Sequence, residues 1–386
     1  MQLIENTENL SLLCQRLSKE NFVCVDLEFL RQHTYFAELC LIQIASPNEA
    51  AIIDPLAKDI NLQAFFDLMQ NPNIVKVFHS GRQDIEILYN LTSKIPTPIF
   101  DTQIAASVAG FGESISYENL VNHILNISID KSSRLSDWSK RPLSENQLSY
   151  ALSDVTHLVL IYQHLKSWLE EQNRIDWIKD DIANICNENL YKINVYDAWQ
   201  KMRHRSHSPR FLTLLRELAA WRETRAINKN VPRHSFIKDE LLLNICADCP
   251  QNKDDLATVR GMRADMASGI IGDEIIDVIQ KFKLLDKDDY VTPPKIKDFS
   301  GVDGPLLELL KLLLRIKAQE YKIVPRMLAN DDDLKIFCHH HNKDFSNKQE
   351  WQKNIFWKDA LKIKNGQIAI SYDQKTNSIK FISISK

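Results

Sequence analysis

Short apolar runs alternate with amphipathic stretches over the first ~165 residues of the chain. Runs at 22–25, 39–45, 50–53 and 74–78 are bounded by turn residues and predict β-strands. Only a few residues separate the first three runs, so we expect them to form an antiparallel meander. The fourth follows a helical stretch and can lie parallel. The pattern predicts an α/β domain in which helices flank a mixed sheet.

Helical periodicity dominates beyond residue 176, until segments 367–371 and 378–384 alternate like the strands of a terminal hairpin. Segment 285–294 is polar, ends in two prolines, and predicts a linker. The expected organisation is an α/β domain at 1–170, a helical connector at 171–205, and two small helical domains at 206–286 and 295–386.

The composition of the 386-residue chain, 44% hydrophobic and 26% charged, is ordinary for a globular protein. No apolar run is long enough to span a membrane, and the N-terminus lacks the pattern of a secretion signal. Seven irregularly spaced cysteines do not predict a disulfide framework, so we expect a cytoplasmic protein without a membrane partner. The net charge is −3, yet segment 201–240 holds ten Lys or Arg against four acidic residues. Both a phosphate-binding surface and a solvated helical face fit that segment.

Two carboxylates, Asp26 and Glu28, end the first apolar run. Residues two apart on a strand project from the same face. The preceding residues are apolar at every position, which predicts a central strand buried on both sides. Two such carboxylates repel each other and lose hydration, unless the strand end is simply solvated.

Asp84 follows the run at 74–78 and lies in the first turns of a predicted helix. Ser80 and Gln83 match a capping box, which predicts that the helix begins at Gly81. The aspartate would then lie at the carboxyl edge of the sheet, where ligand sites of α/β proteins concentrate. The alternative is that it only complements the helix dipole.

Tyr150 and Asp154 are i, i+4 neighbours on an amphipathic helix that opens with a second capping box, Ser144 to Gln147. A core tyrosine beside a solvated aspartate is the alternative. If Asp84 and Asp154 converge with Asp26 and Glu28, the four carboxylates carry a negative charge that two divalent cations would balance. All ligands are hard oxygens, so we expect two Mg²⁺ or Mn²⁺ ions. Two such ions serve phosphodiester hydrolysis, with the tyrosine orienting the attacking water.

These motifs together resemble the DEDD exonuclease superfamily in its tyrosine branch, and specifically the ribonuclease D family. The resemblance covers roughly residues 20–165 and rests on the following segments: 26–31, 34–35, 39–43, 78–84, 100–103, 130–133, 137–138 and 141–143. Downstream, 215–218, 221–222, 226, 230–233, 237–239, 242 and 260–261 resemble the HRDC domain, a nucleic-acid-binding accessory. Leu27 departs from the family, which commonly has threonine there; on a strand it points away from the acids, so the metal ligands should be unaffected.

The resemblance implies a ribonuclease H-like exonuclease domain at 1–170, an HRDC domain at 206–286, and a second, diverged HRDC-like domain at 295–386. It implies Asp26, Glu28, Asp84 and Asp154 as metal ligands, with Tyr150 as a fifth catalytic residue. The implied reaction removes nucleoside 5′-monophosphates from the 3′ end of single-stranded RNA, on tRNA precursors and similar small structured RNAs. We expect a monomer in which segment 201–238 contacts phosphates. Residues expected to hold substrate are Arg82, Gln83, Lys131 and Arg141.

Two other functions remain open: the same hydrolysis on DNA, and RNA binding by a nuclease domain that has lost catalysis. The sequence retains all four acids, which favours an active enzyme. Cys246 and Cys249 have CxxC spacing, but no second pair accompanies them, so we interpret them as a helix end before Pro250. Asp101 is interpreted as a helix N-cap.

Overall fold

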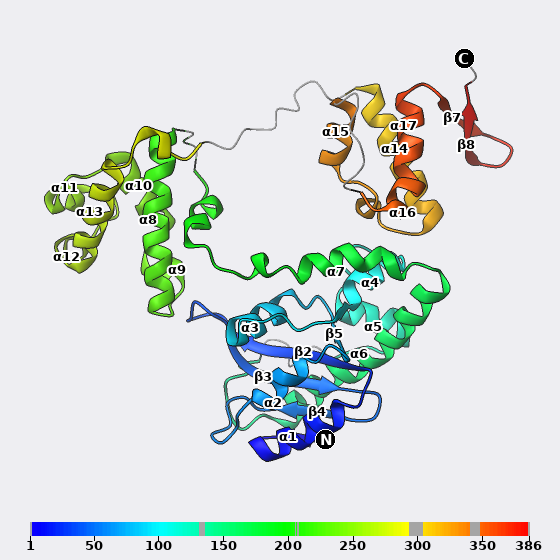
Figure 1. Ribbon diagram of the computed structural model, residues 1–386, viewed down its shortest axis with the longest axis horizontal. Coiled ribbons are helices and arrows are strands. Elements are labelled where there is room, and N and C mark those ends of the chain that lie inside the picture. Colours follow the sequence, from blue (N-terminus) through cyan, green and yellow to red (C-terminus); the bar gives the residue numbers. More distant parts are fainter. Residues whose placement is uncertain are drawn as a thin grey trace.

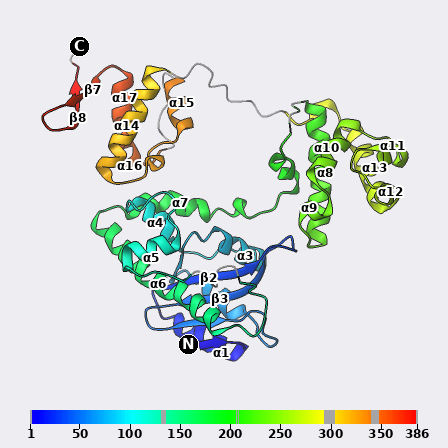
Figure 2. The same ribbon diagram turned by 180° about the vertical axis from the view of Figure 1, so that it is seen from behind.

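The computed structural model describes residues 2–130, 136–204, 206, 208–292, 304–339 and 348–384. Figure 1 shows an N-terminal α/β domain and two helical domains that lie apart from each other on the same side of it. Seen from behind in Figure 2, the two helical domains again lie on the same side of the α/β domain. No helix in the described ranges is both long and apolar enough to cross a bilayer.

The N-terminal domain is built on one mixed sheet, whose described strands run in the order β1-β4-β3-β2-β5-β6. β2 is central: it pairs antiparallel with β3 and parallel with β5, and β3 pairs antiparallel with β4. The predicted meander and the predicted parallel strand are therefore both confirmed. The strands are β1 (Gln2–Ile4), β2 (Phe22–Leu30), β3 (Glu38–Ala45), β4 (Ala50–Ile53), β5 (Val75–Phe78) and β6 (Ile99–Asp101).

Helices cover both faces of this sheet, and successive side chains of β2 are buried on opposite faces. Val23, Val25 and Leu27 pack against α1, α2 and α3, whereas Phe22 and Cys24 pack against α4, α5 and α6. The central strand is thus buried on both sides, as predicted. The helices are α1 (Thr7–Leu17), α2 (Gln63–Met69), α3 (Arg82–Thr92), α4 (Thr102–Val108), α5 (Tyr117–Leu125) and α6 (Glu145–Glu171).

The rest of the described chain is helical up to a terminal hairpin, as predicted. The connector contains 3-10 turns at Ile175–Ile178, Glu188–Leu190 and Val195–Lys201, and α7 (Lys179–Ile185). The first helical domain contains α8 (Pro209–Asn228), α9 (Arg233–Phe236), α10 (Asp239–Asp248), α11 (Lys253–Thr258), α12 (Ala264–Ser268) and α13 (Ile270–Lys283). The C-terminal domain contains α14 (Pro305–Tyr321), α15 (Asp331–His339), α16 (Glu350–Gln352), α17 (Lys358–Lys364), β7 (Ile368–Asp373) and β8 (Ser378–Ser383).

Both helical domains contact the N-terminal domain. In the β2–β3 loop, the Tyr35 hydroxyl donates to Glu223 of α8, and the Tyr35 amide donates to the Asn230 side chain at 3.1 Å. On the other side, Arg326 of the C-terminal domain pairs with Glu113 of the N-terminal domain. The Trp351 ring of the C-terminal domain also stacks on Trp177 of the connector, with centroids 4.3 Å apart and planes at 7°. The N-terminal domain is therefore held at two separate places.

The predicted capping box at the start of α3 is wrong, although the helix begins close to the predicted residue. The Ser80 side chain does not cap α3; its own backbone adopts φ +57°, and Gly81 is the N-cap without a side-chain hydrogen bond. The Asp101 carboxylate replaces that cap, because it accepts the Ser80 and Gly81 N–H groups at 3.2 and 2.8 Å. The second capping box, between Ser144 and Gln147, is present as predicted.

Candidate active site

Asp26 and Glu28 project from the same face of β2, the face covered by α6. Leu27, between them, is 4% exposed and packs in the opposite core, so its side chain does not enter the site. The register with β3 shifts between Glu28 and Phe29. Such a bulge turns the strand and re-aims nearby side chains. The strand thus presents two acids together, and the bulge lies directly after the second.

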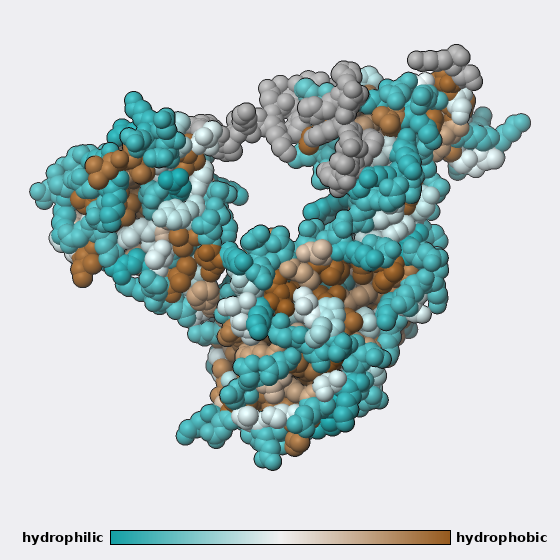
Figure 3. Space-filling view, in the orientation of Figure 1, coloured by the Kyte–Doolittle hydropathy of each residue, from teal (hydrophilic) through white to brown (hydrophobic). Residues whose placement is uncertain are grey.

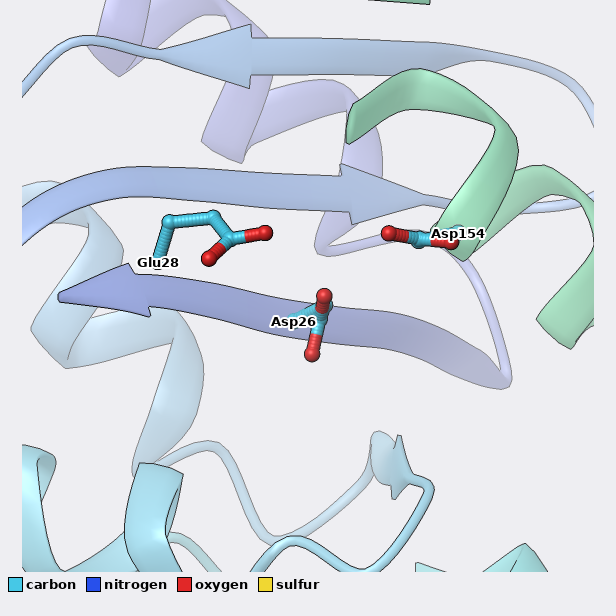
Figure 4. A group of neighbouring side chains, drawn as sticks. All are labelled: Asp26, Glu28 and Asp154. Atoms are coloured by element: carbon cyan, nitrogen blue, oxygen red, sulfur yellow. The ribbon is translucent and has the colours of Figure 1, made fainter. Parts of the chain in front are cut away.

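Asp154 meets these two acids from α6. Ligand oxygens of Asp26, Glu28 and Asp154 all lie within 4.8 Å of one another. Figure 4 shows the three carboxylates turned toward a common space between the strand and the helix. Asp154, far from Asp26 and Glu28 in the sequence, therefore forms one cluster with them.

Asp84 lies outside this three-residue group but is buried beside Asp26. It is 7% exposed in the first turn of α3, and the Asp26 charge contributes to raising its pKa. Adding a Cβ at Gly81 would place it 2.5 Å from the Phe78 Cβ, so the chain approaches β5 closely just before α3 begins. The structure therefore puts the fourth acid, buried, within the electrostatic reach of Asp26.

Asp101 fixes the start of α3 as well as its own helix. Besides the Ser80 and Gly81 amides, its carboxylate accepts the N–H groups of Gln103 and Ile104 at the start of α4. The sequence predicted only this N-cap, which is confirmed. The contact with the α3 start links residues 20 positions apart, so the local pattern gave no sign of it.

Tyr150 donates a hydrogen bond to the Asp154 carboxylate, which favours the charged form of that carboxylate. Its ring stacks on Trp138 with centroids 6.2 Å apart. Tyr117, which the sequence analysis did not single out, donates its hydroxyl to the Asp154 backbone carbonyl. These contacts fix the position of α6, and with it the Asp154 carboxylate, relative to β2.

Burial is the main cause of the raised pKa values of the carboxyl groups in the site. It raises the pKa of Asp26 to about 6 and, together with the Asp26 charge, that of Asp154 to about 8. Burial likewise raises the pKa of Asp84 well above its ordinary value. Without a counter-charge, the site therefore favours protonated carboxyl groups.

Comparison with known proteins places this geometry in a family. The chain is 38% identical to the ribonuclease D of Granulibacter bethesdensis over 99% of its own length and 96% of the relative's, and 40% identical to that of Bartonella henselae, over 95% and 91%. The chain belongs to the ribonuclease D family. The predicted resemblance is thereby confirmed over nearly the whole chain.

Two different domain families match separate parts of this chain. Residues 1–170 match the 3′-5′ exonuclease family and residues 211–279 match the HRDC domain. The crystal structure of Escherichia coli RNase D, described as an exoribonuclease involved in structured RNA processing, has the same fold. It has a TM-score of 0.78 and 23% identity, and covers 95% of this chain and 98% of that one. The predicted α/β exonuclease domain followed by an HRDC domain is confirmed; that the C-terminal helices form a second HRDC-like domain stays a prediction.

The donor set of this site fits divalent cations. In the described part of the chain, Asp26, Asp84 and Asp154 form no ion pair with a lysine or arginine. Opposite Asp26 on β3, the Gln43 amide is fully buried, and neither of its polar atoms has a hydrogen-bond partner among the described residues. Buried acids and an unsatisfied amide on one face, with only oxygen ligands at hand, suit a hard cation such as Mg²⁺ or Mn²⁺.

The residues expected to hold substrate lie in different surroundings. Arg82 and Gln83 are exposed at the start of α3. Arg141 instead forms a two-point ion pair with Asp54, at 2.6 and 2.7 Å, and also donates to the Cys40 carbonyl. These bonds tie the segment before α6 to the sheet. Lys131 lies outside the described residues.

Proposed function

We propose that this chain is a metal-dependent 3′-to-5′ exoribonuclease that removes nucleoside 5′-monophosphates from single-stranded RNA ends. The observation that carries the proposal is the meeting of Asp26, Glu28 and Asp154 oxygens within 4.8 Å, with Asp84 buried beside Asp26. The family name of the relatives supports RNA as the substrate.

Asp26 is the acid shared by both halves of the site, because it neighbours both the Glu28–Asp154 pair and Asp84. We infer that two Mg²⁺ or Mn²⁺ ions bind there, one held by Asp26, Glu28 and Asp154, the other by Asp26 and Asp84. Bound divalent ions lower the pKa of an attacking water and stabilise the departing 3′-oxygen.

The protein's own side chains orient the reactants. Tyr150 is held against Asp154 and Trp138 with its hydroxyl at the cluster, where it positions the water by hydrogen bonding. A phenol has an ordinary pKa near ~10 and does not deprotonate water freely. Arg82 and Gln83, exposed two residues and one residue before Asp84, hold the phosphates of the RNA.

The helical domains supply the preference for tRNA precursors and similar small structured RNAs. We propose that they hold the folded RNA body through segment 201–238 while its 3′ tail enters the site, and that one copy of the chain suffices, acting in the cytoplasm. The HRDC match at residues 211–279 supports this division of labour, because that range is separate from the one that matches the exonuclease family.

The test is digestion of 3′- and 5′-labelled RNA with and without EDTA, using the parent, Asp26→Asn, and Asp67→Asn as an exposed control on α2. We expect stepwise loss from the 3′ end by the parent and the control, abolished by EDTA or by Asp26→Asn while the folded-state circular dichroism is unchanged. Asp26→Asn digesting as fast as the parent would refute the site. Faster loss of a matched DNA oligonucleotide would refute RNA as the substrate.

A further inference from the structure

A cleft of about 630 Å³ lies where the exonuclease domain, the connector and the HRDC domain meet. The β2–β3 loop and α3 form one wall, residues 189–201 of the connector form another, and the segment around Arg233 closes the third. In Figure 1 the β2–β3 loop reaches toward α9, next to this junction. Figure 3 shows open space between the two helical domains, above the exonuclease domain. The walls of the cleft therefore come from three separate parts of the chain.

Positive charge in this cleft is only partly neutralised. Arg31 pairs with Glu86, and Arg233 pairs with Glu223 at 3.1 Å. Arg82 and Lys201 also line the cleft, both exposed, and neither forms an ion pair within the described residues. Two cations on facing walls thus remain available to an anionic ligand.

Apolar side chains lie among these cations. Leu190 and Ile193 of the connector line the cleft and are 45% and 43% exposed, respectively. Exposed apolar side chains beside unneutralised cations suit single-stranded nucleic acid, because its bases can pack on an apolar surface while its phosphates meet the charges.

Two arginines that line the cleft are close in the sequence to the acids of the site. Arg31 follows Glu28 by three residues along β2 and its end, on the order of 10 Å. Arg82 precedes Asp84 by two residues in the first turn of α3. An RNA whose 3′ end lies at the acids can therefore continue directly into the cleft.

We propose that this cleft binds the single-stranded segment of RNA immediately 5′ of the nucleotides being removed. Arg82 and Lys201 contact its phosphates, and Leu190 and Ile193 contact its bases. Lys201 is the first residue of segment 201–238, so the single strand meets the folded RNA body where that segment begins. The proposal rests on the exoribonuclease activity proposed above and adds a length requirement to it: RNA long enough to fill the cleft binds more tightly than a dinucleotide.

The test compares Lys201→Ala with the parent on two substrates, a dinucleotide and an unstructured RNA long enough to fill the cleft. We expect the KM for the long RNA to rise roughly tenfold, with kcat/KM for the dinucleotide unchanged. With the Asp26→Asn background to prevent cleavage, the slope of log Kd against log salt should fall by about 0.7 on Lys201→Ala. Lys201→Arg should restore both values.

The matched control is Lys179→Ala, an exposed connector lysine outside the cleft that pairs with Asp176. It should leave both substrates unaffected. A Lys201→Ala variant with parental KM and salt slope on the long RNA would overturn the cleft assignment while the dinucleotide rate still reports the nuclease. Equal losses on both substrates would overturn it too, because the effect would then not depend on length. A parent that cleaves neither substrate would instead refute the exoribonuclease function.

Discussion

The carboxylate of Asp101 offers a sharp test of how the start of α3 is positioned. Its Oδ2 accepts the Gly81 N–H at 2.8 Å, and its Oδ1 accepts the Ser80, Gln103 and Ile104 N–H groups. In Asp101→Asn, the side-chain oxygen can keep the three Oδ1 contacts, but the new NH₂ group then faces the Gly81 N–H. Losing one hydrogen bond to a charged group costs about 1.5–3 kcal/mol of folding free energy.

The same change should weaken the site, because Asp84 lies three residues after Gly81. Outer partners that orient metal ligands typically change metal affinity or activity by roughly 10–100-fold. We therefore expect Asp101→Asn to raise the Mg²⁺ concentration for half-maximal exonuclease rate by that factor. Asp101 is a positioning residue, since nothing places it against the substrate.

The measurement combines urea unfolding of the full chain with Mg²⁺ titration of the exonuclease rate. Asn6→Ala is the matched control: Asn6 caps α1 by accepting the Asn9 N–H at 2.9 Å, and α1 takes no part in the site. The control should lose about 0.5–2 kcal/mol of stability with a parental Mg²⁺ titration. If Asp101→Asn shows the same behaviour as the control, Asp101 is a cap only, and the reasoning about Asp84 fails.

Other consequences can be checked separately. Tyr150→Phe should lower kcat by about 10²-fold and raise the Mg²⁺ concentration for half-maximal rate, because Asp154 loses the hydrogen bond that favours its charged form; a parental kcat would exclude its role in orienting water. Leu27→Thr should cost about 1–3 kcal/mol of stability, since it buries a hydroxyl in the core opposite the acids, and leave the rate per folded molecule unchanged; a faster enzyme would contradict that geometry. The pKa values of Asp26 and Asp154, about 6 and about 8, exceed their ordinary 3.8. The metal-free fold therefore holds protons that the unfolded chain has released, so its stability falls as pH rises from about 4 to about 8, and Mg²⁺ should stabilise more at the upper end. The measurement is the melting temperature of the parent and of Asp154→Asn against pH, in EDTA and in Mg²⁺. A difference in melting temperature between the two proteins that does not change with pH would contradict this reasoning. Trp351→Ala should release the C-terminal domain, seen as faster limited proteolysis between the domains, and unchanged cleavage would show that the stacked rings do not hold it.

Local sequence signals predicted most of the fold that positions the site. The two-residue spacing of Asp26 and Glu28 gave the same-face acids, and the uninterrupted apolar run before them gave the buried central strand. The Ser144–Gln147 box gave the start of α6. The edge strands Gln2–Ile4 and Ile99–Asp101 were missed, because three residues are too few to show a period.

Long-range contacts explain what the sequence did not predict. The α3 cap comes from Asp101 rather than Ser80, and Arg141 is occupied by Asp54, 87 residues away. Gln43 did carry a signal, a polar residue inside an apolar strand, but only the strand register places it opposite Asp26. The tertiary fold, not residue type, decides these partners.

The close approach at Gly81 has a consequence for interpreting other sequences. With a Cβ at this position lying 2.5 Å from the Phe78 Cβ, any larger residue must separate the end of β5 from the turn that follows it. A homologue that retains every acid but carries a bulkier residue here should be examined for impaired nuclease activity, even though its catalytic motifs look intact.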